Sequence, residues 1–131
     1  MTNNNKTFFA PHLYIPEGIT DISFYEKAFG AVELLRFNND DGTVHVAELS
    51  FDGVLFHIHE EKTTAGHLSP DTINGTTALI GLFVQDVDSV MTSAVNAGGI
   101  VVSPAQTYDY GYRQGEVKDP FGHIWLIEQK M

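Results

Sequence analysis

The stretch DPFGHIWLIEQ (residues 119–129) combines a turn with an apolar strand near the end of the chain. Asp-Pro-x-Gly favours a tight turn, because proline fixes φ and glycine accepts a left-handed backbone. The preceding YRQGEVK (112–118) supplies a partner strand. The sequence therefore predicts a hairpin, with Trp125 and Ile127 directed toward a helix and Leu126 on the opposite face.

The chain contains the same order of predicted elements twice. In the first half, an apolar stretch at 8–16 precedes a helical period at 20–30, and strand-like runs follow at 32–37, 44–51 and 54–59. The Asp-Gly pair between the last two runs predicts a two-residue type I′ turn. The first half therefore has the order βαβββ.

The second half repeats this order. Strand-like runs at 77–84, 100–104, 112–118 and 123–129 surround a helical period at 86–99. Between the two halves, residues 61–76 are polar and rich in turn-forming residues, which is typical of a linker.

Equivalent glycines support an internal duplication. Gly53 and Gly122 belong to the two final hairpin turns, and 122 − 53 = 69; the helix-ending Gly30 and Gly98 give 98 − 30 = 68. A near-constant offset indicates a repeat. We expect one α+β domain over residues 1–131, made of two βαβββ modules at about 8–60 and 77–129 joined by a polar linker at about 61–76.

The composition bounds the classes of function. A chain of 131 residues has the size of one domain. The absence of cysteine excludes disulfides and thiol nucleophiles and fits a reducing compartment. A net charge of −10 makes nucleic acids and anionic membranes poor partners, and no apolar run approaches the roughly 18 residues of a membrane span. We expect a cytoplasmic protein.

Two motifs in this tandem frame carry a family resemblance. FYEKAFGA (24–31) and YGYRQGEVKDPFGHIW (110–125) resemble the vicinal oxygen chelate superfamily, which includes glyoxalase I, extradiol dioxygenases and the fosfomycin- and bleomycin-resistance proteins. The small phosphonate-operon-associated branch is the most similar. The resemblance implies modules side by side, forming a curved mixed sheet around a cavity with helices outside, and usually a homodimer. Because this scaffold hosts many chemistries, it does not assign an activity.

The resemblance also implies where a metal ion would bind. Metal enzymes of the superfamily place one ligand on the first strand and one on the last strand of each module. The matching positions in this sequence are Ala10, His57, Leu79 and Leu126. Only His57 has a side chain that can coordinate a metal, so we expect the usual metal centre, and with it any cofactor, to be absent.

Hairpin geometry brings a carboxylate and an imidazole together in the first module. A two-residue Asp-Gly turn places Glu48 opposite His57 on one sheet face. These side chains are expected either to form an acid–base pair or to line a wet pocket as a hydrogen-bonded pair. His12 and His59 share the face, so a displaced divalent metal held by these four residues is an alternative.

In the second module, a two-residue turn at DPFG would place Arg113 opposite Glu128. This pair could orient an anionic substrate or form a cross-strand ion pair. Tyr108, Tyr110 and Tyr112 could form a lid, half-buried strand positions or a dimer contact. The same turn gives two further pairs, Gly115–Leu126 and Val117–Ile124.

The sequence favours a metal-independent protein that binds a small molecule in a cavity between the modules. The alternative is a lyase, isomerase or dioxygenase-type enzyme that uses His12, Glu48, His57 and His59, by acid–base chemistry or through a displaced metal. We expect the pocket to be lined by His12, Tyr14, His59, Phe83, Tyr110, Arg113 and Glu128.

Overall fold

The computed structural model describes residues 6–131. The first module comprises β1 (His12–Ile15), α1 (Phe24–Phe29), β2 (Val32–Asn38), β3 (Val44–Phe51) and β4 (Val54–Glu60). A connecting segment contains η1 (Thr63–Ala65) and α2 (Pro70–Ile73). The second module comprises β5 (Leu79–Phe83), α3 (Val87–Asn96), β6 (Ile100–Thr107), β7 (Tyr112–Lys118) and β8 (Ile124–Lys130).

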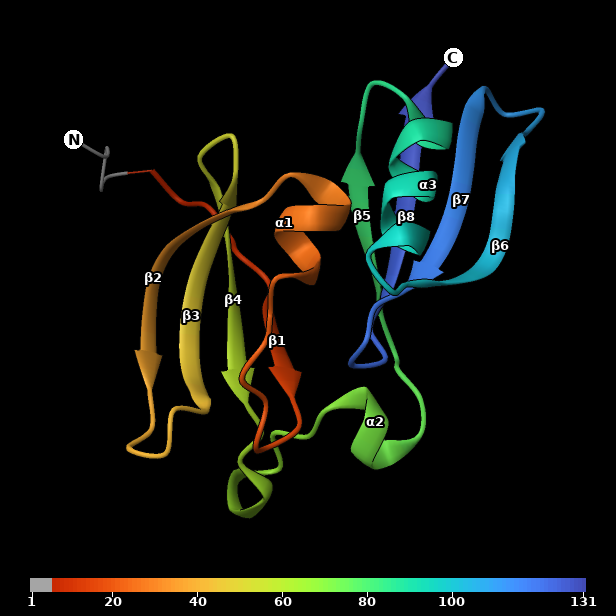
Figure 1. Ribbon diagram of the computed structural model, residues 1–131. Helices are drawn as coiled ribbons and strands as arrows, with labels where there is room; N and C mark the ends of the chain where they lie inside the picture. The colour runs from red at the N-terminus through yellow and green to blue at the C-terminus, as the bar shows by residue number, and fades with distance from the viewer. Residues whose placement is uncertain (1–5) are drawn as a thin grey trace.

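The two modules have the same topology. Each forms a four-stranded mixed sheet, ordered β1-β4-β3-β2 in the first and β5-β8-β7-β6 in the second (Figure 1). In each sheet one edge strand is parallel to its neighbour: β1 to β4 in the first module and β5 to β8 in the second. The other neighbouring pairs are antiparallel. The predicted α+β architecture of two βαβββ modules is confirmed.

Local sequence signals set the ends of the helices. The Asp86 side chain accepts a hydrogen bond from the Ser89 N–H, which satisfies a free donor at the start of α3. Helix α1 is shorter than the predicted helical period, because Asp21 accepts the Ser23 N–H in a turn that precedes it. Gly30 ends α1 in the left-handed conformation.

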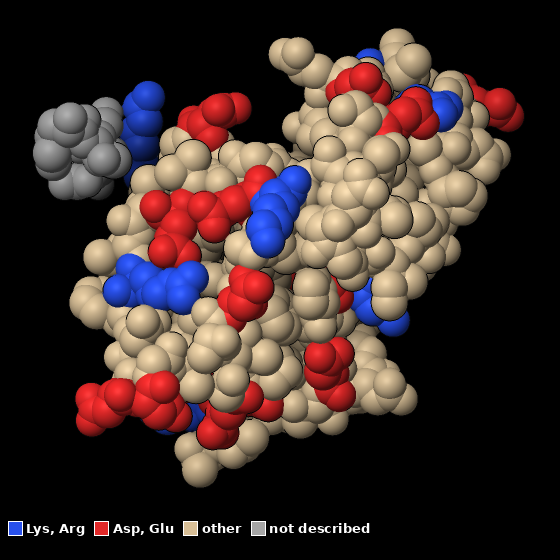
Figure 2. Space-filling view, viewed as in Figure 1, with Lys and Arg blue, Asp and Glu red and all other residues tan. Residues whose placement is uncertain are grey.

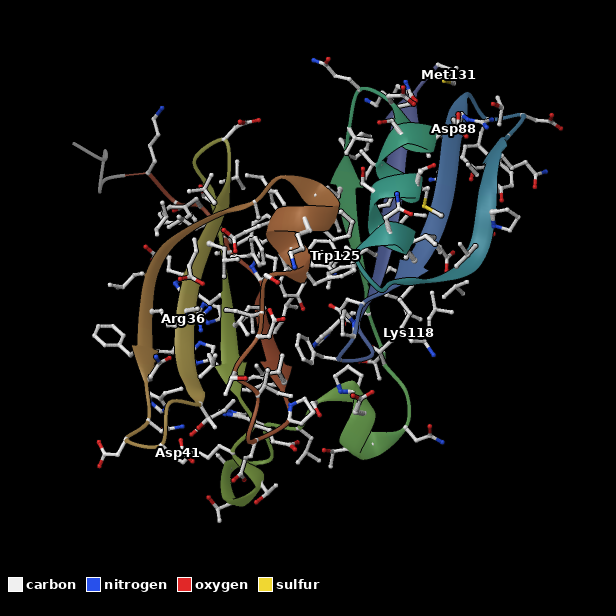
Figure 3. All side chains as sticks on the ribbon, viewed as in Figure 1. Arg36, Asp41, Asp88, Lys118, Trp125 and Met131 are labelled. Carbon is white, nitrogen blue, oxygen red and sulfur yellow. The ribbon has the colours of Figure 1, made fainter. Side chains whose placement is uncertain are left out.

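The helices bring the two modules into one core. Helix α1 packs against α3, and Trp125 of β8 lies against α1, with ring centroids 5.7 Å from Tyr25 and 4.8 Å from Phe29 (Figure 3). Trp125 is only 1% exposed, and Ile127 is fully buried, which confirms that both face the helices. A side chain of the second module therefore completes the core of the first.

A buried carboxylate ties the modules together. Asp119 accepts hydrogen bonds from the Tyr25 hydroxyl at 2.7 Å and from the Trp125 indole N–H at 3.0 Å. Burial raises the pKa of Asp119, and burial together with this carboxylate raises the pKa of the Tyr25 hydroxyl. His123 Nε2 lies 2.7 Å from the Tyr14 carbonyl oxygen, so the same turn also reaches β1.

The register predicted for the first hairpin is confirmed. Asp52 and Gly53 both have positive φ, 51° and 89°, as a type I′ turn requires. Glu48 pairs with His57 and Val46 with His59 across β3 and β4.

The register predicted for the second hairpin is wrong by one residue. The Gly122 N–H donates to the Asp119 carbonyl, the Asp119 N–H donates to the His123 carbonyl, and Gly122 has φ 94°. DPFG is thus a turn followed by a left-handed glycine that inserts one extra residue into the hairpin. A slip of one residue moves side chains to the other face. The observed pairs are Gln114–Glu128, Gly115–Ile127, Glu116–Leu126, Val117–Trp125 and Lys118–Ile124.

Each sheet has one face packed on the helices and one turned away from them, on which most side chains are half-buried or exposed. We name the latter faces the first open face, which carries His12, Tyr14, Glu48, His57 and His59, and the second open face, which carries Phe83, Tyr112, Gln114, Leu126 and Glu128. Within residues 6–131, no helix is both long and apolar enough to cross a membrane.

Candidate functional site

The first open face holds a stack of imidazole rings. His12 is the partner of His57 across the parallel pair β1–β4, and their ring centroids are 4.4 Å apart with an interplanar angle of 9°. His59 follows two positions along β4 and stacks on His12 at 5.1 Å. Ala10 lies before β1 begins. The residue beside His57 is therefore His12, and not Ala10, which the resemblance matches to the ligand position of the first strand.

Hydrogen bonds organise these rings. His12 Nδ1 lies 2.9 Å from His59 Nε2, and His57 Nε2 lies 3.1 Å from Glu48 Oε2. Burial first, and then the neighbouring imidazoles, lower the pKa of His12 and of His59. Both rings therefore bind a proton less readily than a solvated imidazole does. The other ring nitrogen of His57, Nδ1, is buried without a hydrogen-bond partner.

The second module has no metal-coordinating side chain at the two positions that correspond to His12 and His57. His57 follows its partner His12 by 57 − 12 = 45 residues, and Leu126 follows its partner Gly81 by 126 − 81 = 45. Gly81 is thus the counterpart of His12, at the same offset that relates Leu79 to Ala10 in the sequence. Neither glycine nor leucine has a side chain that coordinates a metal.

The histidines do not fit a metal either. Because the rings of His12 and His57 are stacked nearly parallel, their in-plane lone pairs run side by side and do not converge on one point. No group of three or more His, Cys, Asp or Glu side chains within residues 6–131 has the arrangement of a metal site. The donor set observed does not match the four-ligand centre implied by the resemblance.

The second open face has a different chemistry. Glu128 is the partner of Phe83 on β5, and its carboxylate accepts a hydrogen bond from the Gln114 amide at 2.8 Å. The Tyr110 hydroxyl donates to the Gln114 side-chain oxygen. Tyr110 packs on Tyr112 and Tyr108, with centroids 5.7 and 5.4 Å apart. A carboxylate, an amide and several phenol rings therefore share this face.

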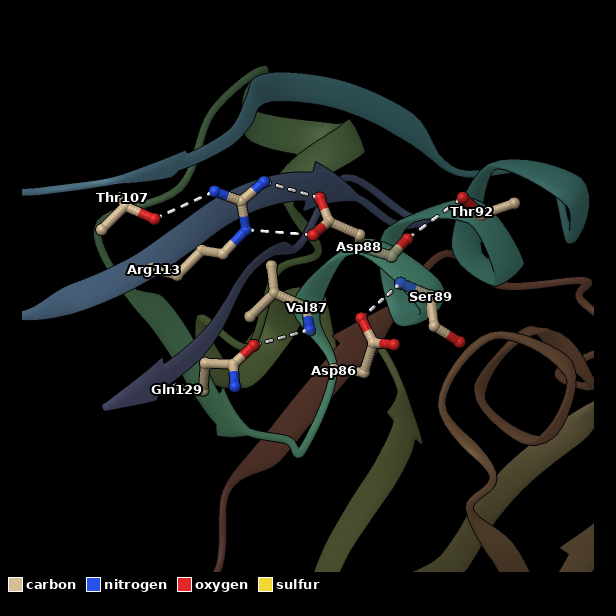
Figure 4. Close-up of polar contacts among 8 residues, drawn as sticks. All are labelled: Asp86, Val87, Asp88, Ser89, Thr92, Thr107, Arg113 and Gln129. Carbon is tan, nitrogen blue, oxygen red and sulfur yellow. Dashed lines mark hydrogen bonds and ion pairs between the residues drawn. The ribbon is translucent and has the colours of Figure 1, made fainter. Parts of the chain in front are cut away.

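Arg113 does not belong to either open face. Its guanidinium binds Asp88 of α3 through two hydrogen bonds, of 3.0 and 2.8 Å, and donates to the Thr107 hydroxyl at 3.0 Å (Figure 4). This contact lowers the pKa of Asp88 and raises that of Arg113. The predicted juxtaposition of Arg113 and Glu128 is wrong, because the extra residue in the turn puts Arg113 on the helix side of β7.

A groove of about 490 Å³ lies at the junction of the modules. It runs from the residues before β1 and the start of β4 to strand β5. Of the pocket residues predicted from the sequence, it includes Phe83 alone. Its lining is formed by Phe9, Pro11, Phe51, Asp52, Val54, Leu55, Phe56, Ile80, Gly81, Leu82, Phe83 and Trp125.

Gly81 and Gln114 lie at positions of the second open face that the sequence did not single out as site residues. Gly81 follows His12 by the repeat offset, 81 − 12 = 69, so the duplication contained the signal that would have found it. Gln114 had no such signal, because its place beside Glu128 depends on the register of the second hairpin.

The comparisons agree with this architecture. The profile of the Glyoxalase/Bleomycin resistance protein/Dioxygenase superfamily matches residues 20–127. An uncharacterised protein of Mycobacterium bovis is 36% identical over 132 residues, which cover 98% of this chain and 87% of that protein. The chain therefore belongs to the Glyoxalase/Bleomycin resistance protein/Dioxygenase superfamily.

Solved structures show the same fold. The crystal structure of TioX from Micromonospora sp. ML1 is 25% identical with a TM-score of 0.69, covering 95% of this chain and all of that chain (100%). The X-ray structure of an Arabidopsis thaliana gene product is 24% identical with a TM-score of 0.71, covering 95% of this chain and 99% of that chain.

Proposed function

We propose that this protein binds a small molecule in the groove between its modules and that the binding does not use a metal. The observation that carries the proposal is the groove itself, whose volume of about 490 Å³ and largely apolar lining suit a small organic ligand. Within the superfamily, we infer membership of the phosphonate-operon-associated branch from FYEKAFGA and DPFGHIW.

We propose further that two copies of the chain associate. Apolar side chains stand exposed on β2, among them Leu35 at 49% and Phe37 at 55% exposure. Exposed apolar surface of this kind marks an interaction site. Sedimentation velocity should give a dimer, and Phe37→Glu should shift the protein toward the monomer. A monomer at all concentrations of the wild type would contradict the association.

The binding proposal is tested with the neutral fluorophore N-phenyl-1-naphthylamine, whose emission rises in an apolar site. The wild type should enhance the emission in a saturable manner. Leu55→Trp fills the groove and should weaken binding by about tenfold or more. Ile100→Trp adds the same ring at an exposed position outside the groove and should leave binding unchanged. Equal affinity of both variants for the fluorophore would contradict the proposal.

Metal independence has its own test. Protein dialysed against Zn²⁺, Ni²⁺ or Mn²⁺ should retain no stoichiometric metal, and chelator treatment should leave fluorophore binding unchanged. The expectation follows from the stacked histidines and from Gly81 and Leu126. One tightly bound metal per chain that disappears in His12→Gln would refute it.

An acid–base enzyme is the second candidate. The observation that favours it is the contact of His57 with Glu48, together with the unpartnered and buried Nδ1 of His57. A carboxylate next to an imidazole can move a proton beside a carbonyl group, as in a lyase or isomerase. The test is exchange of carbon-bound protons of pyruvate in deuterated water, followed by NMR. Exchange by the wild type that Glu48→Gln abolishes would support this candidate.

A further inference from the structure

Glu128 is a shielded carboxylate without a positive partner. It is only 7% exposed, and its hydrogen bond comes from Gln114, which is neutral. No Lys or Arg of residues 6–131 forms an ion pair with it. Arg113, the expected partner, is held on the other face by Asp88. Removing a carboxylate from water is costly unless a counter-charge offsets the loss of hydration.

Aromatic rings lie on the same open face as this carboxylate. Phe83 is its direct neighbour across β5 and β8, and the rings of Phe83 and Tyr112 are 6.1 Å apart. Tyr110 continues the row, hydrogen-bonded to the same Gln114 that holds Glu128. Desolvation first, and then Tyr108 and Glu128, raise the pKa of the Tyr110 hydroxyl, so the ring is neutral at pH 7. The faces and edges of these rings are available to a ligand because Tyr110 and Phe83 are both exposed.

Gly81 leaves room for the carboxylate. A Cβ atom at this position would lie 2.8 Å from Glu128 Oε2, which is closer than van der Waals contact. Gly81 and Phe83 also line the groove between the modules. The Glu128 carboxylate therefore lies beside the end of the groove that these two residues form.

We propose that the second open face binds a cationic group of the ligand, an ammonium or a ring-borne iminium, with Glu128 as its counter-ion and Phe83, Tyr110 and Tyr112 as its aromatic wall. Aromatic rings attract cations through their negative faces, and a carboxylate adds a full charge. The net charge of −10, visible as acidic side chains spread over the surface in Figure 2, further favours a cation over an anion. The inference rests on the proposed function and names the chemical class of its ligand.

Two dyes of nearly the same shape, one charged and one neutral, distinguish binding through charge from binding through apolar contact. 10-Methylacridinium carries a permanent positive charge, and acridine is its neutral counterpart at pH 8. Each is titrated with the full-length protein, and binding is followed by fluorescence. The wild type should bind the cationic dye at least about tenfold more tightly than the neutral one.

Variants locate the effect. Glu128→Gln keeps the shape of the side chain and its hydrogen bond but removes the charge. It should lower the affinity for the cationic dye by about tenfold and leave the affinity for acridine unchanged. Tyr110→Leu alters an exposed side chain and should lower the affinity for the cationic dye by about threefold or more. Glu26→Gln, at an exposed position of α1, makes the same change in net charge and should bind both dyes as the wild type does.

Each outcome decides the proposal. The proposal is supported if Glu128→Gln lowers the affinity for the cationic dye selectively. Should that variant fail to fold, the same result in Tyr110→Leu supports it. Equal affinity for both dyes, unaltered in these variants, overturns the cation site and leaves the proposed function standing. The same loss of affinity for the cationic dye in Glu26→Gln also overturns the cation site, because the effect would then come from net charge. Binding of neither dye overturns the cation site, and the titration with N-phenyl-1-naphthylamine then decides separately whether the proposed function stands.

Discussion

His12 and His57 lie side by side on parallel strands β1 and β4, with their rings stacked 4.4 Å apart at an angle of 9°. Stacking at this distance, with His59 bonded to His12 at 2.9 Å, favours imidazoles that are neutral. A proton on one ring would place a positive charge against its neighbours in a partly desolvated site. The first open face is thus sensitive to acid.

Acidification should destabilise the protein through this stack. The pKa of His12 and of His59 is lowered in the folded state, so the unfolded chain binds more protons as the pH falls below about 6.5. The stability present above that pH is lost as the pH falls toward the lowered values. The melting temperature should therefore fall by a few degrees, about 2–4 °C, between pH 7.5 and 5.5. His12→Gln should reduce this fall; an unchanged fall would argue against the stack as its source.

Arg113 should contribute to stability only weakly and to ligand binding not at all. It is joined to Asp88, an exposed residue, and exposed ion pairs contribute little. Arg113→Ala should lower the melting temperature by no more than about 2 °C. In the dye titrations it should behave as the wild type does. A tenfold loss of affinity for the dyes would instead mean that Arg113 reaches the ligand.

Asp119 should be among the residues most important for stability. Its carboxylate accepts from the Tyr25 hydroxyl, the Trp125 indole and the backbone N–H groups of Phe121 and His123. Asp119→Ala leaves these four donors without their acceptor and should lower the free energy of unfolding by about 3–5 kcal/mol, measured by urea denaturation. Tyr25→Phe removes one donor and should cost about 1 kcal/mol. Similar costs for both variants would contradict a shared network centred on Asp119.

Gly122 should tolerate substitution less well than Gly98. Both have positive φ, 94° and 109°, so alanine strains the backbone at either position. At Gly122 a Cβ would also lie 2.8 Å from the Pro70 Cβ and 2.9 Å from Asp71 Oδ1, whereas at Gly98 it would meet nothing within 4 Å. Gly122→Ala should cost about 2–4 kcal/mol and Gly98→Ala about 1 kcal/mol in the free energy of unfolding. Equal costs would show that contact with α2 does not matter.

The sequence predicted the contact between Glu48 and His57 correctly because its determinants are local. An Asp-Gly pair adopts positive φ at both residues, which fixes a two-residue turn, and strict alternation then fixes which side chains share a face. The repeat of βαβββ was readable for the same reason, since helix ends and hairpin turns are marked by glycines at a nearly constant offset.

The register of the second hairpin could not be predicted in this way. DPFG is compatible with a two-residue turn or with a turn followed by a left-handed glycine, and the local sequence does not distinguish them. Tertiary packing does: the observed register buries Val117 beside Trp125 against the helices and packs Gly122 on α2. That one-residue difference moves Arg113 away from Glu128 and brings Gln114 to it.

The sequence by itself thus determined the two modules, the first hairpin and the absence of donors at Leu126. Only the tertiary structure decided that Glu128 has no Lys or Arg partner among residues 6–131 and that a groove forms at the junction of the modules. The physical reason is separation along the chain. Phe9, Leu55, Phe83 and Trp125 meet only because α1 and α3 pack together, and no local pattern encodes the geometry of that contact.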